Sequence, residues 1–270
     1  PDLDPGYHTG LSFITCYEVL AKQVPLMIDT MEIDITPAVG TRLSGHVARS
    51  KPSCGILDPL FARASLLETP YTKNMIVSLD LLELSAETVD IIRSELSEKN
   101  TITRDHIMIS TTHTHTGPPT IDLGALEADR DYLRDMVERI TEGWANLGMN
   151  ALQVTVESVL FPLEVGINRR FRNTKTGAIC MRPNSQGSRD DEVVATIFRD
   201  GEGQVHTIWI NTSVHPTTLG VSINSVSADY PGSIVHHIKK LFGDRISVIP
   251  FTGACGDVRP ALIDLEKNYF

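Results

Sequence analysis

Stretches with the residue pattern of β-strands alternate along this chain with stretches that have the pattern of amphipathic helices. Alternating or β-branched-rich runs, typical of strands, lie at 31–37, 74–84, 105–111, 152–161, 193–200, 204–214 and 245–251. Apolar residues recur at helical spacing in 86–98 and 126–147, and a third helix is expected to begin near Asp229. Strands and helices mixed in this order predict an α/β fold, with a β-sheet flanked by helices.

The sheet is expected to be mixed, with antiparallel as well as parallel pairs. The segment "RDGEGQ" at 199–204 separates two strand patterns by a few polar and glycine residues, which predicts a hairpin. The polar stretch 184–192 is interpreted as a loop within one domain. We therefore expect a single large domain at 31–270, preceded by an N-terminal extension at 1–30 whose patterning is less clear.

The composition of the chain argues against several classes of binding partner and site. The chain has 34 acidic and 24 basic residues, a net charge of −10 and no run of like charges, so nothing indicates a surface that follows nucleic acid. No stretch approaches the ~20 apolar residues of a transmembrane helix. The four cysteines form no Cys-x-x-Cys pair, which argues against a cysteine-built zinc site. Cytoplasmic, periplasmic and secreted locations all stay open, as does the oligomeric state.

Histidines follow two of the predicted strands. "TTHTHTGP" places His113 and His115 two residues apart, so both project from one face if the strand continues through them. His215, in "WINTSVHP", follows another strand pattern. Ligands bind at the carboxyl ends of strands in α/β sheets, and imidazole is a common zinc ligand. The spacing indicates a metal site, although a solvated strand edge explains His-x-His alone equally well.

Three further segments could line the same edge of the sheet. Arg169, in "GINRRF", could hold a carboxylate or an oxyanion, or could lie on the solvated surface. Asp229 and Tyr230 stand at the expected helix start, where capping alone explains the aspartate. Cys255, in "FTGACGDVRP", is either a small buried residue or a nucleophilic thiol.

The order of these motifs is similar to that of a known family. The matching stretches are "MEIDITP", "GHV", "GILDPLFARA", "VSLDLLEL", "ISTTHTHTGP", "GINRR", "NTSVHPTTL" and "FTGACGDVRP". Together, over 31–260, they resemble the neutral/alkaline (non-lysosomal) ceramidase family. The resemblance implies a zinc-dependent amidase that cleaves the N-acyl bond of a small-molecule or lipid-like substrate. It also implies His113 and His215 as zinc ligands, and His115 and Arg169 as catalytic residues.

The sequence departs from this family in two ways. The family completes its zinc site with a glutamate and a tyrosine much further along the chain than Phe270. Either the chain is a fragment truncated at its C-terminus, or Asp229 or Tyr230 substitutes, or no tight metal site forms. In addition, Arg259 stands where ceramidases carry a serine implicated in catalysis. Two alternatives therefore stay open: a catalytically inactive binding or structural member of the same fold, and a hydrolase that uses Cys255.

Overall fold

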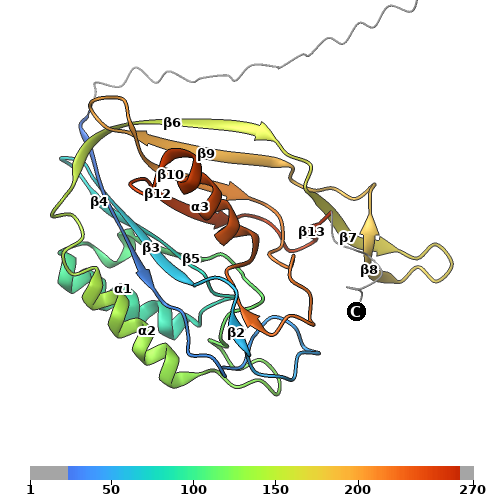
Figure 1. The fold of residues 1–270 in the computed structure, drawn as a ribbon. Helices are drawn as coiled ribbons and strands as arrows, with labels where there is room; N and C mark the ends of the chain where they lie inside the picture. The colour runs from blue at the N-terminus through green and yellow to red at the C-terminus, as the bar shows by residue number, and fades with distance from the viewer. Residues whose placement is uncertain (1–23, 262–270) are drawn as a thin grey trace, which may run out of the picture.

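The computed structural model describes residues 24–261, and its main element is one eight-stranded sheet (Figure 1). In spatial order the strands are β12 (Ser247–Thr252), β10 (Val205–Thr212), β9 (Glu192–Arg199), β6 (Leu152–Pro162), β1 (Leu26–Asp34), β3 (Phe61–Glu68), β4 (Lys73–Leu79) and β5 (Ile107–Thr111). The β10–β12 and β4–β5 pairs are parallel, and the other pairs are antiparallel. The mixed α/β sheet expected from the sequence is confirmed.

The sheet bends so that its two halves face each other. The Ser78 hydroxyl on β4 donates to the carbonyl oxygen of Pro250 on β12 at 2.6 Å. Trp209 on β10 donates through its indole nitrogen to the hydroxyl of Ser65 on β3 at 3.0 Å. Each bond joins a strand of one half to a strand of the other, so β1, β3, β4 and β5 form one layer and the remaining four strands form a second.

Helices cover the outer face of each layer. The helices α1 (Ala86–Asn100) and α2 (Arg130–Gly143) cover the β1–β3–β4–β5 half, and α3 (Asp229–Phe242) covers β10 and β12. The largest core cluster joins α1 and α2 to alternate residues of β3 and β4, among them Leu66, Met75, Leu79, Ile92, Met136, Ile140 and Trp144. The alternation of strand side chains thus sends one set to the helices and the other set between the sheet layers.

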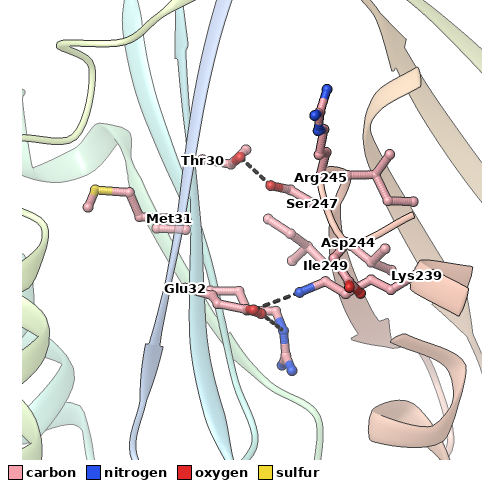
Figure 2. Close-up of a pocket in the computed structure, with 12 residues that line it drawn as sticks. Thr30, Met31, Glu32, Lys239, Asp244, Arg245, Ser247 and Ile249 are labelled. Atoms are coloured by element: carbon pink, nitrogen blue, oxygen red, sulfur yellow. Dashed lines mark hydrogen bonds and ion pairs between the residues drawn. The ribbon is translucent and has the colours of Figure 1, made fainter. Parts of the chain in front are cut away.

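A polar cavity of about 120 Å³ lies between β1 and the start of β12 (Figure 2). Figure 2 shows a hydrogen bond between the side chains of Thr30 and Ser247, with 2.5 Å between the hydroxyl oxygens. The Glu32 carboxylate pairs with Lys239 of α3 at 2.6 Å and with Arg63 of β3 at 3.3 Å. These contacts fasten the two layers together at this edge.

Two small sheets complete the fold. One consists of β13 (Val258–Pro260), β7 (Gly166–Arg172) and β8 (Ile179–Asn184), and the other pairs β2 (Gly55–Ile56) with β11 (Ser225–Val226). A 3-10 turn at Arg104–His106 precedes β5. Among the helices of residues 24–261, none combines the length and apolarity needed to cross a membrane.

The expected elements are found with shifted boundaries. The seven strand patterns correspond to β1, β4, β5, β6, β9, β10 and β12, and "RDGEGQ" does connect the antiparallel pair β9–β10. The strand β3 and the strands of the small sheets were not predicted. The sequence offers Asp229 or Ser227 as the cap of α3, but the N-cap position is Ala228 and Asp229 is the first helical residue. Ser227 still contacts the helix start, because the backbone N–H of Asp229 donates to its hydroxyl at 2.9 Å. The division of the chain at residue 31 stays a prediction, and β1 begins at Leu26.

A buried ion pair provides a test of the β3–β4 packing. Arg63 donates to Asp80 at 2.7 Å, and these side chains are 4% and 0% exposed. Asp80→Ala leaves a buried guanidinium without its shortest ion-pair contact, so we expect the free energy of unfolding to fall by about 3–5 kcal/mol. Urea denaturation measures this change.

The matched control is Glu95→Ala, which removes the partner of Lys99 in an exposed ion pair of 3.8 Å. Because exposed pairs contribute little, this variant should lose less than about 1 kcal/mol. An Asp80→Ala loss no larger than that of the control would show that the buried pair does not stabilise the packing.

Candidate metal centre

Three histidines far apart in the sequence form one cluster. The nitrogen atoms that His113, His115 and His215 could offer to a metal all lie within 4.8 Å of one another. The Nε2 atoms of His115 and His215 are 2.9 Å apart. Within residues 24–261, no other set of three His, Cys, Asp or Glu side chains could hold a metal. The structure therefore brings together the three histidines that the sequence singled out.

The cluster lies where the carboxyl ends of two parallel strand pairs meet. The β4–β5 pair ends at Leu79 and Thr111, and the β10–β12 pair ends at Thr212 and Thr252. The loops that follow β5 and β10 carry the histidines. The Thr252 hydroxyl donates to the carbonyl oxygen of Thr112 at 2.7 Å, which ties the two ends together. Ligand sites at the carboxyl ends of strands are common in α/β folds.

The loop after β5, and not an extended strand, sets the direction of the first two rings. The strand ends at Thr111, and His113 has a φ of 66°, in the left-handed region. The hydroxyls of Thr114 and Thr116 both donate to the carbonyl oxygen of Ser227, at 2.7 and 2.8 Å. The expectation that strand alternation aligns the two histidines is therefore wrong, and the threonines between and after them fix the loop instead.

Backbone carbonyl groups hold one nitrogen of each ring. The Nδ1 atoms contact the carbonyl oxygens of Leu82 (from His113, 2.9 Å), Gly45 (from His115, 2.8 Å) and Cys255 (from His215, 3.2 Å). A carbonyl oxygen can only accept a hydrogen bond, so each Nδ1 must carry the proton. Each Nε2 of a neutral ring is then left with a lone pair, the form in which imidazole binds a metal.

The surroundings keep the His115 and His215 rings neutral. Burial, followed by the charges of His215 and His113, lowers the pKa of His115 to about 2. Burial, followed by the charge of Arg169, lowers the pKa of His215 to about 4. Two neutral nitrogens whose lone pairs face each other at 2.9 Å repel unless a cation lies between them. The donor set therefore fits a bound divalent metal ion.

Arg169 lies beside this cluster, in the middle of β7. Its guanidinium donates to the carbonyl oxygen of Gly256 through Nε at 3.2 Å and Nη2 at 2.8 Å. Burial lowers the pKa of its guanidinium. Its charge acts on His215, as the lowered pKa of that ring shows. The structure thus places Arg169 where it can add positive charge next to the histidines, whereas Arg170 is exposed.

Arg259 and Cys255 also lie near His215. Arg259, on β13, is buried opposite Ile167 of β7, and its charge contributes to the lowered pKa of Arg169. The backbone N–H of His215 donates to the carbonyl oxygen of Val258 on β13 at 3.2 Å. Burial raises the pKa of the Cys255 thiol. A raised pKa disfavours the thiolate, which argues against a cysteine nucleophile.

Asp229 and Tyr230 do not join the three histidines. The Asp229 carboxylate accepts from the hydroxyl of Thr218 at 2.7 Å and from the backbone N–H of Leu219 at 3.1 Å. The Tyr230 hydroxyl donates to the carbonyl oxygen of Val214 at 2.5 Å. Both side chains therefore brace the loop that carries His215, and the Asp229 carboxylate is not part of the candidate metal group among the His, Cys, Asp and Glu side chains of residues 24–261.

Sequence reasoning missed a second loop that supports the site. Gly45 accepts from His115, and its φ of +92° is a conformation that favours glycine. The His46 ring lies 5.2 Å from the His115 ring, centroid to centroid. Arg49, 7% exposed, donates to the carbonyl oxygen of His115 at 2.6 Å. The motif "GHV" marked this segment in the sequence, but no periodicity connected it to the histidines.

Metal titration tests whether the cluster is a binding site. We expect the purified chain to bind zinc. His113→Ala and His215→Ala should each weaken zinc binding by at least about 100-fold, because loss of a metal ligand costs more affinity than loss of a residue that only hydrogen-bonds a ligand. Competition with a chromophoric chelator measures the affinity. His237→Ala removes an exposed histidine on α3 and should leave the affinity unchanged. Equal affinities in all four proteins would show that zinc binds elsewhere.

Comparisons with known proteins agree with the described fold. No family model matches the chain, and no curated protein matches it. The structure of neutral ceramidase from Pseudomonas aeruginosa matches with a TM-score of 0.74 and 17% identity, over 92% of this chain and 41% of that chain. A ceramidase complexed with C2 matches with a TM-score of 0.73 and 17% identity, over 88% of this chain and 39% of that chain. The chain spans less than half the length of these structures, and it shares their mixed α/β fold.

Proposed function

We propose that this chain is a zinc-dependent hydrolase of the ceramidase type, which cleaves an N-acyl amide bond. The observation that carries the proposal is the convergence of three imidazole rings, whose available nitrogen atoms lie within 4.8 Å of one another and whose Nδ1 atoms contact backbone carbonyl groups. The similarity of fold to neutral ceramidase supports the choice of reaction. Hydrolysis consumes one water and one amide and yields a carboxylic acid and an amine.

In this proposal His113 and His215 hold the metal. All three rings are close enough to share one ion, so distance alone does not separate ligand from catalyst. The separation follows the family resemblance, in which the first histidine of His-Thr-His and the later histidine are ligands. A zinc ion at such a site supplies Lewis-acid chemistry, since it lowers the pKa of water to about 7 and polarises a carbonyl group.

The remaining side chains act on protons and charge. His115 is fixed through Nδ1 to Gly45, so its Nε2 can hydrogen-bond the attacking water. Because burial lowers the pKa of this ring, it takes up a proton only against the negative charge of the tetrahedral intermediate, and it then passes that proton to the leaving amine. Arg169, held on Gly256, provides positive charge beside the cluster, where it can stabilise the oxyanion of the tetrahedral intermediate. The substrate is expected to be a small-molecule or lipid-like acyl amide.

A second candidate is a binding or structural protein that keeps the fold without turnover. Arg259 favours it, because a buried arginine replaces the serine that the resembled family carries there. The absence of a carboxylate from the histidine group, within the described ranges, points the same way. This candidate predicts zinc binding with no hydrolysis, so the two candidates separate in a single assay.

Hydrolysis of a short-chain fluorescent N-acyl amide tests the proposal. We expect activity that a chelator abolishes and zinc restores, and that thiol alkylation leaves unchanged. His115→Ala should reduce kcat by about 100-fold or more while zinc stays bound, because general acid–base catalysis contributes that much. His113→Ala should lose both zinc and activity.

The control for the histidine variants is His237→Ala, which should keep full activity. A zinc-loaded chain without activity on any acyl amide would support the second candidate. Activity that survives chelation and is lost on alkylation would instead identify Cys255 as the nucleophile.

Gly45→Ala tests the proposed role of His115 from its neighbour. A Cβ atom at this position would lie 2.6 Å from the His115 ring, and the φ of +92° strains any other residue. The ring must therefore shift, and we expect kcat to fall about 10- to 100-fold with zinc still bound, since small misplacements are costly. Gly40→Ala, at a φ of +100° with open space for a Cβ, is the matched control. Equal kcat values in the two variants would exclude the positioning role.

A further inference from the structure

The hairpin formed by β7 and β8 differs in charge from the rest of the chain. Residues 165–189 contain six basic residues and no acidic residue, in a protein with a net charge of −10. Four of these cations, at Arg170, Arg172, Lys175 and Arg182, are exposed on the hairpin. Figure 1 shows the hairpin projecting from the main sheet, on the side away from α1 and α2. A basic element is thus displayed outside the body of an acidic protein.

Strand pairing sorts the hairpin side chains onto two faces. Arg170 lies opposite Met181, and Arg172 lies opposite Ile179. Directly paired residues share a face, and so do residues two apart on one strand. These four residues therefore form one face, which we call the Arg–Met face. Ile179 and Met181 are 55% and 59% exposed, so two large apolar side chains on β8 lie beside two arginine side chains on β7.

The four exposed cations of the hairpin have no acidic partner among residues 24–261. Within the described residues, no carboxylate lies within ion-pair distance of Arg170, Arg172, Lys175 or Arg182. By contrast, Arg189, the last base of the segment, pairs with Asp191 at 2.7 Å. Within the part of the chain that the structure describes, the positive charge of the hairpin is therefore not compensated by ion pairs, and such charge attracts an anionic surface.

We propose that the Arg–Met face docks on an anionic lipid surface. Guanidinium groups bind lipid phosphates, while Ile179 and Met181 enter the boundary between headgroups and acyl chains. The apolar pair decides between lipid and nucleic acid, because exposed Ile and Met gain from an acyl boundary and have no base to stack on. Complementary charge brings the face to the surface, and apolar burial holds it there.

The hairpin begins next to the histidine cluster. Gly166 to Asn168 of β7 pair with β13, and β13 accepts the backbone N–H of His215 at Val258. Docking would therefore bring the cluster close to the lipid surface. The docking inference goes beyond the proposed hydrolysis and does not depend on it, because lipid binding can be measured on vesicles that contain no acyl amide.

Vesicle cosedimentation of the full chain tests the inference. We expect binding to phosphatidylcholine vesicles that contain about one-third phosphatidylserine, weak binding to phosphatidylcholine alone, and loss of binding at high salt. Arg170→Ala/Arg172→Ala should weaken binding about 25-fold, since each cation near an anionic surface contributes about fivefold. Ile179→Ser/Met181→Ser should weaken it about tenfold.

The matched control is Arg130→Ala/Arg134→Ala, which removes the same charge from exposed positions on α2. It should bind the vesicles like the parent chain, and near-ultraviolet circular dichroism should show that every variant keeps its fold. No binding to anionic vesicles, or equal losses in the control and the hairpin pair, would overturn the proposal. It would also be overturned, in favour of nucleic acid, if an oligonucleotide bound more tightly than vesicles and the Ile179/Met181 variant bound normally.

Discussion

The carboxyl ends of two parallel strand pairs lie against each other, and the candidate site depends on this contact. The β4–β5 pair belongs to one half of the bent sheet and the β10–β12 pair to the other. Hydrogen bonds from Ser78 to Pro250 and from Thr252 to Thr112 close the gap between them. Because each half contributes a histidine-bearing loop, the site exists only when the halves are packed together. Folding and assembly of the site are therefore one process.

The histidine cluster is stable only under particular electrostatic conditions. Burial keeps the His115 and His215 rings neutral, and the carbonyl groups that hold Nδ1 leave the Nε2 lone pairs facing each other. Such an arrangement is unfavourable without a cation, yet backbone hydrogen bonds fix each ring in place. The polypeptide thus holds its donors ready at a cost in stability, as expected of a binding site and not of a packing cluster.

The sequence predicted the regular parts of the fold better than the irregular ones. Strong period-2 patterns located β4 and β9, but β3 was missed because "FARASLLE" mixes small, charged and apolar residues. Its alternation becomes clear only once both faces are known to be buried, with Ala62 and Ala64 toward the helices and Arg63 lining the cavity between the two layers. Period alone cannot show burial on two faces.

The same limit applies to the functional residues. His113, His115 and His215 could be found because they follow strand patterns, whereas Gly45 and Arg49 lie in a loop with no period. The basic face of the hairpin was hidden for another reason. Arg170 and Met181 are eleven residues apart in sequence and become neighbours only through strand pairing. The net charge of the whole chain is negative, so it did not reveal the basic segment that contains them.

The arginine at position 259 affects the candidate site through its positive charge. It replaces the serine of the resembled family, and its neighbours on β13 and β7 contact the loop of His215 and carry Arg169. Its positive charge reaches Arg169, whose own charge reaches His215. Arg169 therefore adds positive charge next to a cluster whose nitrogen donors suit a metal cation, and Arg259 acts on Arg169. In the proposed hydrolysis the positive charge of Arg169 would stabilise an oxyanion at the site, so an arginine at position 259, which acts on Arg169, is compatible with acyl-amide hydrolysis.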